Sequence, residues 1–285
     1  MEQQTILLAN KTPMPVLGMG TWFLGEDRRT RQAEIEALRT GLDSGITLID
    51  TAEMYGEGLS EKLIGEAIQG YDRSRLFLVS KVYPHNAGRA HIFQSVQRTL
   101  RHLQMDYLDL YLLHWRGGIP LEETVACMEQ LVREGKIKSW GVSNFDTDDM
   151  EELWSVPDGN HCVVDQVLYH LGSRGVEYDL LPWLRSHHVA MMAYCPLAQA
   201  GTLQKALLKS PAVQEVANAH GVQPMQVLLA FVMAQKDVIA IPRSGNAAHI
   251  RENLAAAGLA LTPEELEKLN RAFPAPDHKT YLDIV

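Results

Sequence analysis

Short apolar stretches of β-strand character alternate with longer stretches of helical periodicity along most of this chain. The strand-like stretches cover residues 16–20, 47–50, 76–81, 107–114, 138–143, 162–167, 189–195 and 238–242. Several are apolar on both faces, as expected for strands that helices cover. Strands that alternate with helices predict a parallel sheet.

The segments between these strands repeat apolar residues at helical spacing. In one of them, Ile35, Leu38 and Leu42 share a face. By the same pattern, helices are expected over residues 92–103, 121–132, 148–155, 179–187, 212–219, 225–235 and 248–257. Eight strand–helix units predict a (β/α)8 TIM barrel, which typically needs about 250 residues.

The main alternative fold is an open, doubly wound sheet. That fold usually carries G-x-G-x-x-G after its first strand, but here Phe23 stands at the third glycine position after Gly18 and Gly20. We therefore expect one barrel domain over residues 1–285. A hairpin of residues 5–8 and 14–17 should close its N-terminal end, and an extra helix from Thr262 to about Ala272 should precede a short tail.

Composition narrows the class of protein. The 285 residues are 46% hydrophobic, which is typical of soluble globular proteins. A net charge of −9 disfavours non-specific nucleic-acid binding, which needs a cationic surface. Cys127, Cys162 and Cys195 are far apart and odd in number, which disfavours a disulfide framework. The acidic N-terminus does not resemble a secretory signal, and the apolar run 227–234 is too short for a membrane span, so we expect a cytoplasmic protein.

Polar residues stand where the predicted strands end, and the carboxyl ends of barrel strands hold the active site. These residues are Asp50, Lys81, His114, Ser143, Asn144, Asp165, Gln166, Tyr194, Arg243 and Ser244. H-x-H and H-E-x-x-H zinc motifs, a G-x-S-x-G elbow and a phosphate-binding P-loop are missing from the sequence, so no metal is expected. Proton-transfer chemistry remains, with Tyr55 in the loop after the second strand.

A lysine ammonium near a tyrosine favours tyrosinate. At about 4 Å and an effective dielectric near 20, the attraction is about 4 kcal/mol, or up to about three pKa units. We therefore expect Lys81 to lower the pKa of Tyr55, Asp50 to keep Lys81 charged, and His114 to orient a carbonyl oxygen. Such a site could protonate the alkoxide that forms when hydride reduces a carbonyl.

Several segments together resemble the aldo-keto reductase family over essentially the whole chain. They are Gly18–Trp22, Leu48–Gly56, Val79–Val82, Asp106–Trp115, Gly141–Phe145, Asp165–Gln166, Ala193–Leu197 and Ile241–Ser244. The resemblance implies a barrel that binds NADPH in extended form without a Rossmann domain. It extends in particular to short bacterial members that reduce methylglyoxal and related small aldehydes.

The resemblance also implies roles for individual residues. The catalytic tetrad becomes Asp50, Tyr55, Lys81 and His114, with Tyr55 as proton donor. Ser143, Asn144 and Gln166 would hold the nicotinamide carboxamide, Tyr194 would stack on the ring, and Leu197, Gln199 and Gly201 would line the pyrophosphate. The full expected cofactor set is Gly20, Thr21, Trp22, Asp50, Ser143, Asn144, Gln166, Tyr194, Cys195, Leu197, Gln199, Gly201, Arg243, Ser244, Asn246, His249, Glu252 and Asn253.

Two residues depart from the family pattern in the segment that matches the adenosine and 2′-phosphate clamp. Arg243 replaces the usual lysine, and His249 replaces the usual arginine. Arginine still binds phosphate bidentately, whereas a histidine is largely neutral at pH 7. We therefore expect NADPH as cofactor, with NADH as the alternative. Cys195, which replaces a frequent serine, is interpreted as a small core residue.

The expected substrate-binding residues are Trp22, Tyr55, Tyr83, His114 and Trp115. The short tail predicts a shallow site without a long lid, suited to small aldehydes and α-dicarbonyls, in a monomer. Two alternatives remain open. One is a regulatory subunit that holds cofactor without significant turnover, and the other is a barrel lyase or isomerase that uses Lys81 as a Schiff base.

Overall fold

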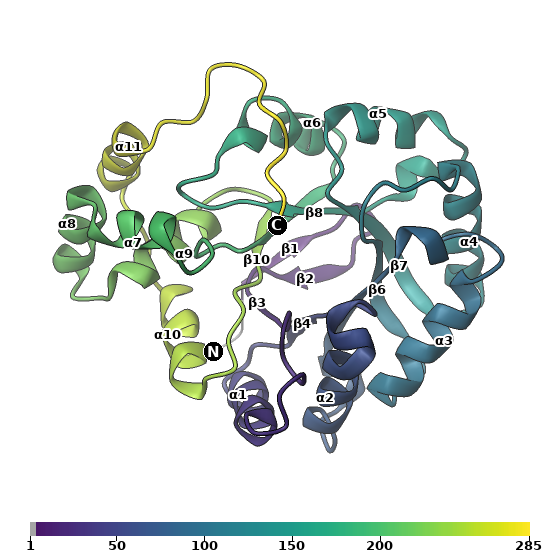
Figure 1. Cartoon of the computed structure of the whole chain (residues 1–285). Coiled ribbons are helices and arrows are strands. Elements are labelled where there is room, and N and C mark those ends of the chain that lie inside the picture. Colours follow the sequence, from purple (N-terminus) through teal and green to yellow (C-terminus); the bar gives the residue numbers. More distant parts are fainter. Residues whose placement is uncertain (1–3) are drawn as a thin grey trace.

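The computed structural model describes residues 4–285 and shows a barrel of parallel strands inside a ring of helices (Figure 1). The strands follow one another around the sheet in chain order. They are β3 (Gly18–Gly20), β4 (Leu48–Asp50), β5 (Phe77–Val82), β6 (Leu108–Leu113), β7 (Ile137–Ser143), β8 (Val164–Leu168), β9 (Ala190–Tyr194) and β10 (Val238–Ala240). Each lies within or beside a predicted strand, and the predicted (β/α)8 barrel is confirmed.

The barrel closes between its first and last strands by isolated bridges rather than by a continuous ladder. Leu17 bridges Ala240, and Gly20 bridges Arg243, both in parallel. The Ala240 N–H donates to the Val16 carbonyl oxygen at 2.8 Å, and the Gly20 N–H donates to that of Pro242 at 3.1 Å. This seam therefore lies beside the residues expected to bind cofactor.

The helices pack around the sheet. They are α1 (Arg31–Asp43), α2 (Leu59–Ala67), α3 (Ile92–Leu103), α4 (Leu121–Arg133), α5 (Thr147–Ser155), α6 (Leu180–Ser186), α7 (Thr202–Lys209), α8 (Pro211–His220), α9 (Pro224–Met233), α10 (Ala247–Ala256) and α11 (Pro263–Ala272). The sequence pattern did not predict α2 or α7. The α7 helix is eight residues long and buries only Leu207, and α2 is nine residues long with Gly65 inside it, so each gives a short and weak helical pattern.

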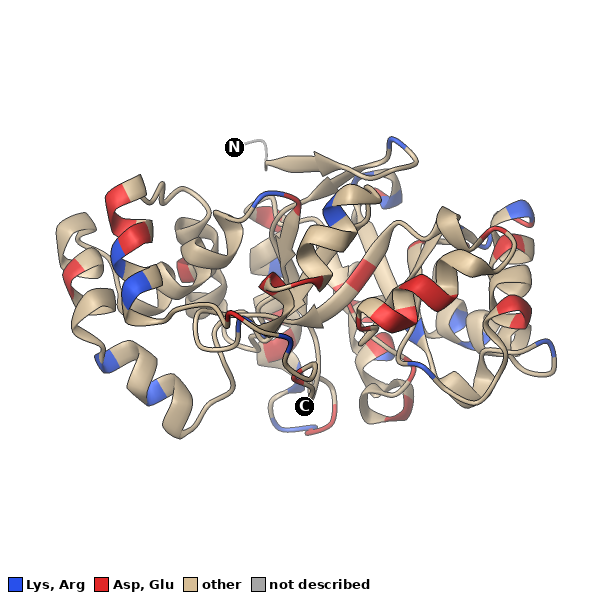
Figure 2. Ribbon diagram, turned by 90° about the horizontal axis from the view of Figure 1, so that it is seen from above, with Lys and Arg blue, Asp and Glu red and all other residues tan. Residues whose placement is uncertain are grey.

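Apolar side chains form two layers, one inside the barrel and one between the strands and the helices. The inner layer includes Leu48, Leu110 and Met192. The predicted N-terminal hairpin, β1 (Thr5–Leu7) and β2 (Pro13–Pro15), is confirmed, and Met14 packs against this layer. Figure 2 shows the hairpin at one end of the molecule and the C-terminus at the other. The hairpin thus closes one end and leaves the carboxyl ends of the strands for the site.

The tail after α11 crosses that second end of the barrel. Lys279 forms ion pairs with Asp146 and with Asp179. These two aspartates are the N-cap residues of α5 and α6, and each also accepts a backbone N–H of its helix. One cation in the tail therefore connects two helix starts beside the strand ends. The predicted helix 262–272 is confirmed, with a capping box of Thr262 and Glu265.

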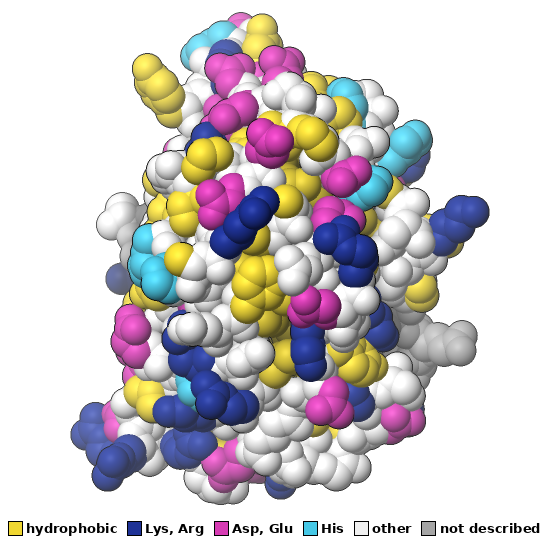
Figure 3. All heavy atoms as spheres, turned by 90° about the vertical axis from the view of Figure 1, so that its right-hand side faces the viewer, with side chains coloured by type: hydrophobic (Ala, Val, Ile, Leu, Met, Phe, Trp, Pro, Cys, Tyr) yellow, Lys and Arg dark blue, Asp and Glu magenta, His cyan; other side chains and the backbone are white. Residues whose placement is uncertain are grey.

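The outer surface carries charges of both signs. On the face in Figure 3, acidic and basic side chains surround a small apolar patch. Among residues 4–285, every helix is too short or too polar to span a bilayer.

Candidate active site

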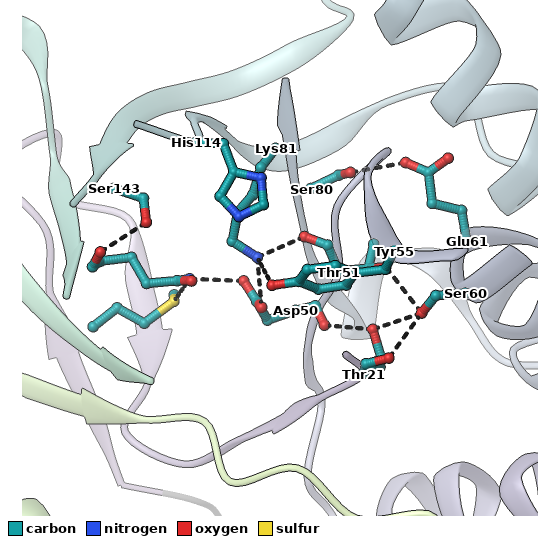
Figure 4. Close-up of polar contacts among 12 residues, drawn as sticks. Thr21, Asp50, Thr51, Tyr55, Ser60, Glu61, Ser80, Lys81, His114 and Ser143 are labelled. Carbon is teal, nitrogen blue, oxygen red and sulfur yellow. Dashed lines mark hydrogen bonds and ion pairs between the residues drawn. The ribbon is translucent and has the colours of Figure 1, made fainter. Parts of the chain in front are cut away.

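The tetrad expected from the sequence meets at the carboxyl ends of β4, β5 and β6 (Figure 4). The ammonium of Lys81 is fully buried. It donates to Asp50 Oδ2 at 2.8 Å, to the Thr51 carbonyl oxygen at 2.8 Å and to the Tyr55 hydroxyl at 3.1 Å. These contacts use all three protons of the ammonium. Lys81 therefore connects the carboxylate of Asp50 to the phenol of Tyr55.

The pKa of Tyr55 differs from the value expected from the sequence. Burial raises the pKa of Tyr55 well above its ordinary value, and the negative charge of Asp50 acts in the same direction. Burial also lowers the pKa of Lys81, while Asp50 opposes that shift. The expectation that Lys81 lowers the pKa of Tyr55 is therefore wrong for the free protein, because desolvation outweighs an ammonium already paired with Asp50. Tyr55 consequently keeps its proton at neutral pH.

His114 completes the polar wall beside the Tyr55 hydroxyl. Its ring meets the Tyr55 ring edge-on, with centroids 5.9 Å apart. Burial, and then the charge of Lys81, hold the pKa of His114 well below its ordinary value, so the imidazole is neutral. Its buried Nδ1 has no hydrogen-bond partner among residues 4–285. A neutral imidazole carries one N–H, which is suited to donating a hydrogen bond to a carbonyl oxygen.

A buried network of hydroxyl groups supports the segment that carries Asp50 and Tyr55. The Thr21 hydroxyl donates to the Asp50 carbonyl oxygen at 2.8 Å, and the Ser60 hydroxyl donates to Thr21 Oγ1 at 2.9 Å. The Thr51 hydroxyl in turn donates to Ser60 Oγ at 3.2 Å. Thr51, which directly follows β4, and Ser60, which lies in the first turn of α2, were not expected at the site from the sequence. This network fixes the carbonyl group of Thr51 that Lys81 binds.

A second polar group lies at the ends of β7, β8 and β9. The Ser143 hydroxyl donates to the Gln166 carbonyl oxygen at 2.8 Å, and the Tyr194 hydroxyl donates to Asn144 Oδ1 at 2.8 Å. The Gln166 side chain donates from Nε2 to Asp50 Oδ1 at 2.8 Å. Gln166 therefore links this group to the tetrad, across strands β8 and β4.

Both groups line a cavity of about 790 Å³. The expected site residues on its wall are Gly20, Thr21, Trp22, Asp50, Tyr55, His114, Ser143, Asn144, Gln166, Tyr194, Cys195, Leu197, Gln199 and Arg243. The wall also includes residues that were not expected from the sequence: Phe23, Met54, Pro196, Ala198, Ala200, Gln204, Ile241, Pro242 and Val285. Most of these adjoin an expected residue in the chain, so widening each motif by one or two positions could have found them. Val285 comes from the tail and had no such signal.

Other expected residues lie beside this cavity rather than on its wall. Trp115 packs against His114 with ring centroids 4.8 Å apart, and Tyr83 meets Trp115 edge-on at 5.9 Å. The remaining members of this set, none of which lines the wall, are Gly201, Ser244, Asn246, His249, Glu252 and Asn253. Asn246 caps α10 by accepting the Ala248 N–H at 2.8 Å, so its side chain serves that helix start.

The residues on this wall fit a dinucleotide. The amide and hydroxyl groups of Asn144 and Ser143 stand next to the ring of Tyr194, and the exposed guanidinium of Arg243 also lines the cavity. Arg243 donates only from Nε, to the Trp22 carbonyl oxygen at 3.0 Å, among the contacts of residues 4–285. The start of α10 follows closely, and a helix N-terminus favours phosphate. A cluster of three or more metal-ligating side chains does not occur among the described residues.

Comparisons with known proteins identify the family of this chain. The sequence profile of the aldo/keto reductase family matches residues 16–273. Methylglyoxal reductase YeaE of Escherichia coli (strain K12) is 52% identical over 285 residues, which is all of both chains. Glyoxal reductase of Bacillus subtilis (strain 168) is 30% identical and covers 96% of this chain and 97% of its own.

A solved structure shares the fold closely. The aldo/keto reductase of Klebsiella pneumoniae in complex with NADP and acetate superposes with a TM-score of 0.96 and is 51% identical. The match covers 99% of this chain and 100% of that one. With a family profile over most of the sequence, a relative of equal length and a barrel of the same architecture, the chain belongs to the aldo/keto reductase family.

Proposed function

We propose that this protein reduces small aldehydes and α-dicarbonyl compounds to alcohols, with NADPH as the source of hydride and Tyr55 as the proton donor. The observation that carries the proposal is the Tyr55 hydroxyl, held 3.1 Å from the buried Lys81 ammonium on the wall of a cavity of about 790 Å³. The 52% identity to a methylglyoxal reductase supports the substrate class. All of these residues belong to one barrel, which supports a single domain, and we propose that the protein is a monomer.

In this mechanism, bound NADPH supplies a hydride to the carbonyl carbon. Tyr55 and His114 donate hydrogen bonds to the carbonyl oxygen and orient it. As negative charge grows on that oxygen, the O–H bond of Tyr55 breaks and its proton moves to the oxygen, which yields the alcohol. Lys81 stabilises the phenolate left on Tyr55, and Asp50 keeps Lys81 charged and in place.

The cofactor residues proposed earlier keep their roles. Ser143, Asn144 and Gln166 would hold the carboxamide, and the ring of Tyr194 would stack on the nicotinamide. Arg243, with the start of α10, would bind the phosphate groups. The full occupancy of the Lys81 ammonium disfavours a Schiff base, which needs a free amine.

His249 sets the strength of NADPH selectivity in this proposal. It is exposed in the first turn of α10, so a His249→Arg variant adds a permanent cation near the expected 2′-phosphate. We expect the ratio of kcat/KM for NADPH to that for NADH to rise about tenfold, equal to about 1.4 kcal/mol.

The control for this change is His161→Arg. His161 is half exposed and precedes β8, at the amino end of the strands, so the selectivity should not change. A wild-type enzyme that prefers NADH would contradict the proposed cofactor.

The size of the cavity predicts which carbonyl compounds react. Trp22, Phe23, Met54 and Val285 form an apolar wall near Tyr55, and Val285 shows that even the short tail reaches the site. Because the cofactor fills much of about 790 Å³, small substrates fit best. We expect kcat/KM, followed by NADPH absorbance, to be higher for methylglyoxal than for ketosteroids. Higher values for a ketosteroid would contradict this substrate class.

A further inference from the structure

Asp165 is a fully buried carboxyl group that the proposed mechanism does not use. Neither of its oxygens has a hydrogen-bond partner among residues 4–285. A buried carboxylate without a partner is costly, so such a group usually stays protonated. Packing of the barrel therefore does not require a carboxyl group at this position, which points to a role in the neighbouring site.

Asp165 lies on the outer side of β8, next to the turn that carries the expected cofactor residues Ser143 and Asn144. In β8, Gln166 points into the barrel and reaches Asp50, so the alternation of a strand directs Asp165 outward, toward the helices. There it lies beside the turn from β7 to α5. Val142 pairs with Asp165 and Ser143 pairs with Gln166. The backbone N–H of Phe145 faces the carboxyl group without forming a full hydrogen bond.

The groups around Asp165 favour its neutral form. Burial raises its pKa well above the ordinary value, and Asp149 and Asp146 at the start of α5 act in the same direction. Cys162 before the same strand and Tyr194 on β9 are the other titratable groups that sense its charge. Only the Phe145 N–H acts the other way. Lys279 is already paired with Asp146, so no cation of the described chain compensates Asp165 directly.

The turn next to Asp165 positions the backbone N–H and the side-chain amide of Asn144. Asn144 has a left-handed backbone, with φ of 57°, which asparagine tolerates better than most residues. Its N–H donates to the Gln166 carbonyl oxygen at 2.9 Å, and its side chain donates to the His114 carbonyl oxygen at 3.1 Å. A small shift of Phe145 would therefore move Asn144 relative to both strands.

We propose that Asp165 is a positioning residue for cofactor binding. As a neutral acid it packs behind the Ser143–Asn144 turn and supports it, and loss of its proton displaces the turn and weakens NADPH binding. This inference rests on the proposed function, in which Ser143 and Asn144 hold the carboxamide. It makes cofactor affinity depend on the ionisation of a group that does not contact the cofactor.

The test compares the wild type with Asp165→Asn, which keeps the size of the side chain and cannot ionise. The Kd for NADPH is measured by quenching of tryptophan fluorescence between pH 6 and 10. We expect equal Kd values at pH 6. Above the pKa of Asp165, the Kd of the wild type rises relative to the variant by up to about tenfold per pH unit.

Asp148→Asn is the matched control, because Asp148 is an exposed carboxylate in the first turn of the same helix. It should leave the pH profile of the Kd as in the wild type.

A second measurement, of stability, needs no cofactor. For a carboxyl group whose pKa is raised by folding, stability falls as pH rises from the unfolded to the folded pKa. The melting temperature of the wild type should therefore fall relative to Asp165→Asn as pH rises above about 4, the ordinary pKa of Asp.

The outcomes separate this inference from the proposed function. If the wild type binds NADPH and the two pH profiles coincide, the role of Asp165 is overturned and the proposed function stands. If Asp165→Asn weakens binding at pH 6 as much as Asp165→Ala does, its role is only structural. If the wild type does not bind NADPH, the proposed function fails, and this inference fails with it.

Discussion

Replacing Tyr55 by phenylalanine should lower kcat/KM for methylglyoxal by about 10³, within the range that a general acid contributes. The change removes one hydroxyl group and keeps the ring that packs beside His114 and Trp22, with centroids 5.9 and 6.4 Å away. The raised pKa of Tyr55 keeps its proton available for transfer at neutral pH. The Kd for NADPH should stay within about twofold, since the hydroxyl contacts the carbonyl oxygen rather than the cofactor.

The measurement follows NADPH absorbance under saturating cofactor, with Tyr83→Phe as the matched control. Tyr83 lies near the site, and its hydroxyl contacts only Glu57, at 3.2 Å, among the described residues. That variant should keep nearly normal kcat. A Tyr55→Phe enzyme with nearly normal kcat would show that another group delivers the proton.

Replacing Lys81 by methionine should impair both stability and reduction. Methionine matches the length of the lysine stem but leaves the buried carboxylate of Asp50 with the Gln166 amide and without a cation. Breaking a buried ion pair in this way costs roughly 3–5 kcal/mol of unfolding free energy. Reduction should also fall by orders of magnitude, because no positive charge then stabilises the phenolate of Tyr55. Thermal melting and steady-state kinetics measure the two effects.

A double variant separates the two roles of Lys81. Adding Asp50→Asn to Lys81→Met removes the uncompensated charge, so most of the lost stability should return while reduction remains impaired. If the single variant melts like the wild type, Asp50 is not buried as a charge. If the double variant regains reduction, the ammonium has no role in proton transfer.

Much of this site follows from two regularities of the sequence. Apolar runs of strand length predict the barrel, and strand ends of a barrel converge, so Asp50, Lys81 and His114 could be grouped before their distances were known. Local motifs then add Ser143 and Gln166, which indeed meet at the same end. Such predictions succeed because each residue is placed by its own strand.

Other features depend on contacts that no local pattern records. Val285 reaches the cavity because the tail binds distant helix starts through Lys279, and the pKa of Tyr55 depends on how deeply three chain segments bury it. Tyr83 and Trp115, which were expected at the substrate, do not line the cavity; Trp115 packs against His114, and Tyr83 packs against Trp115. Their placement depends on loops, whose paths are less constrained by sequence than strands.

A bound dinucleotide would also stabilise the barrel at the seam between β3 and β10. Gly20 and Trp22 lie on one side of this joint and Arg243 on the other, and isolated bridges join the two sides. A molecule that contacts both sides binds only when the seam is closed. By mass action, a higher concentration of that molecule therefore favours the closed barrel. The concentration of the dinucleotide, in either redox form, would in this way also influence how much of the protein is folded.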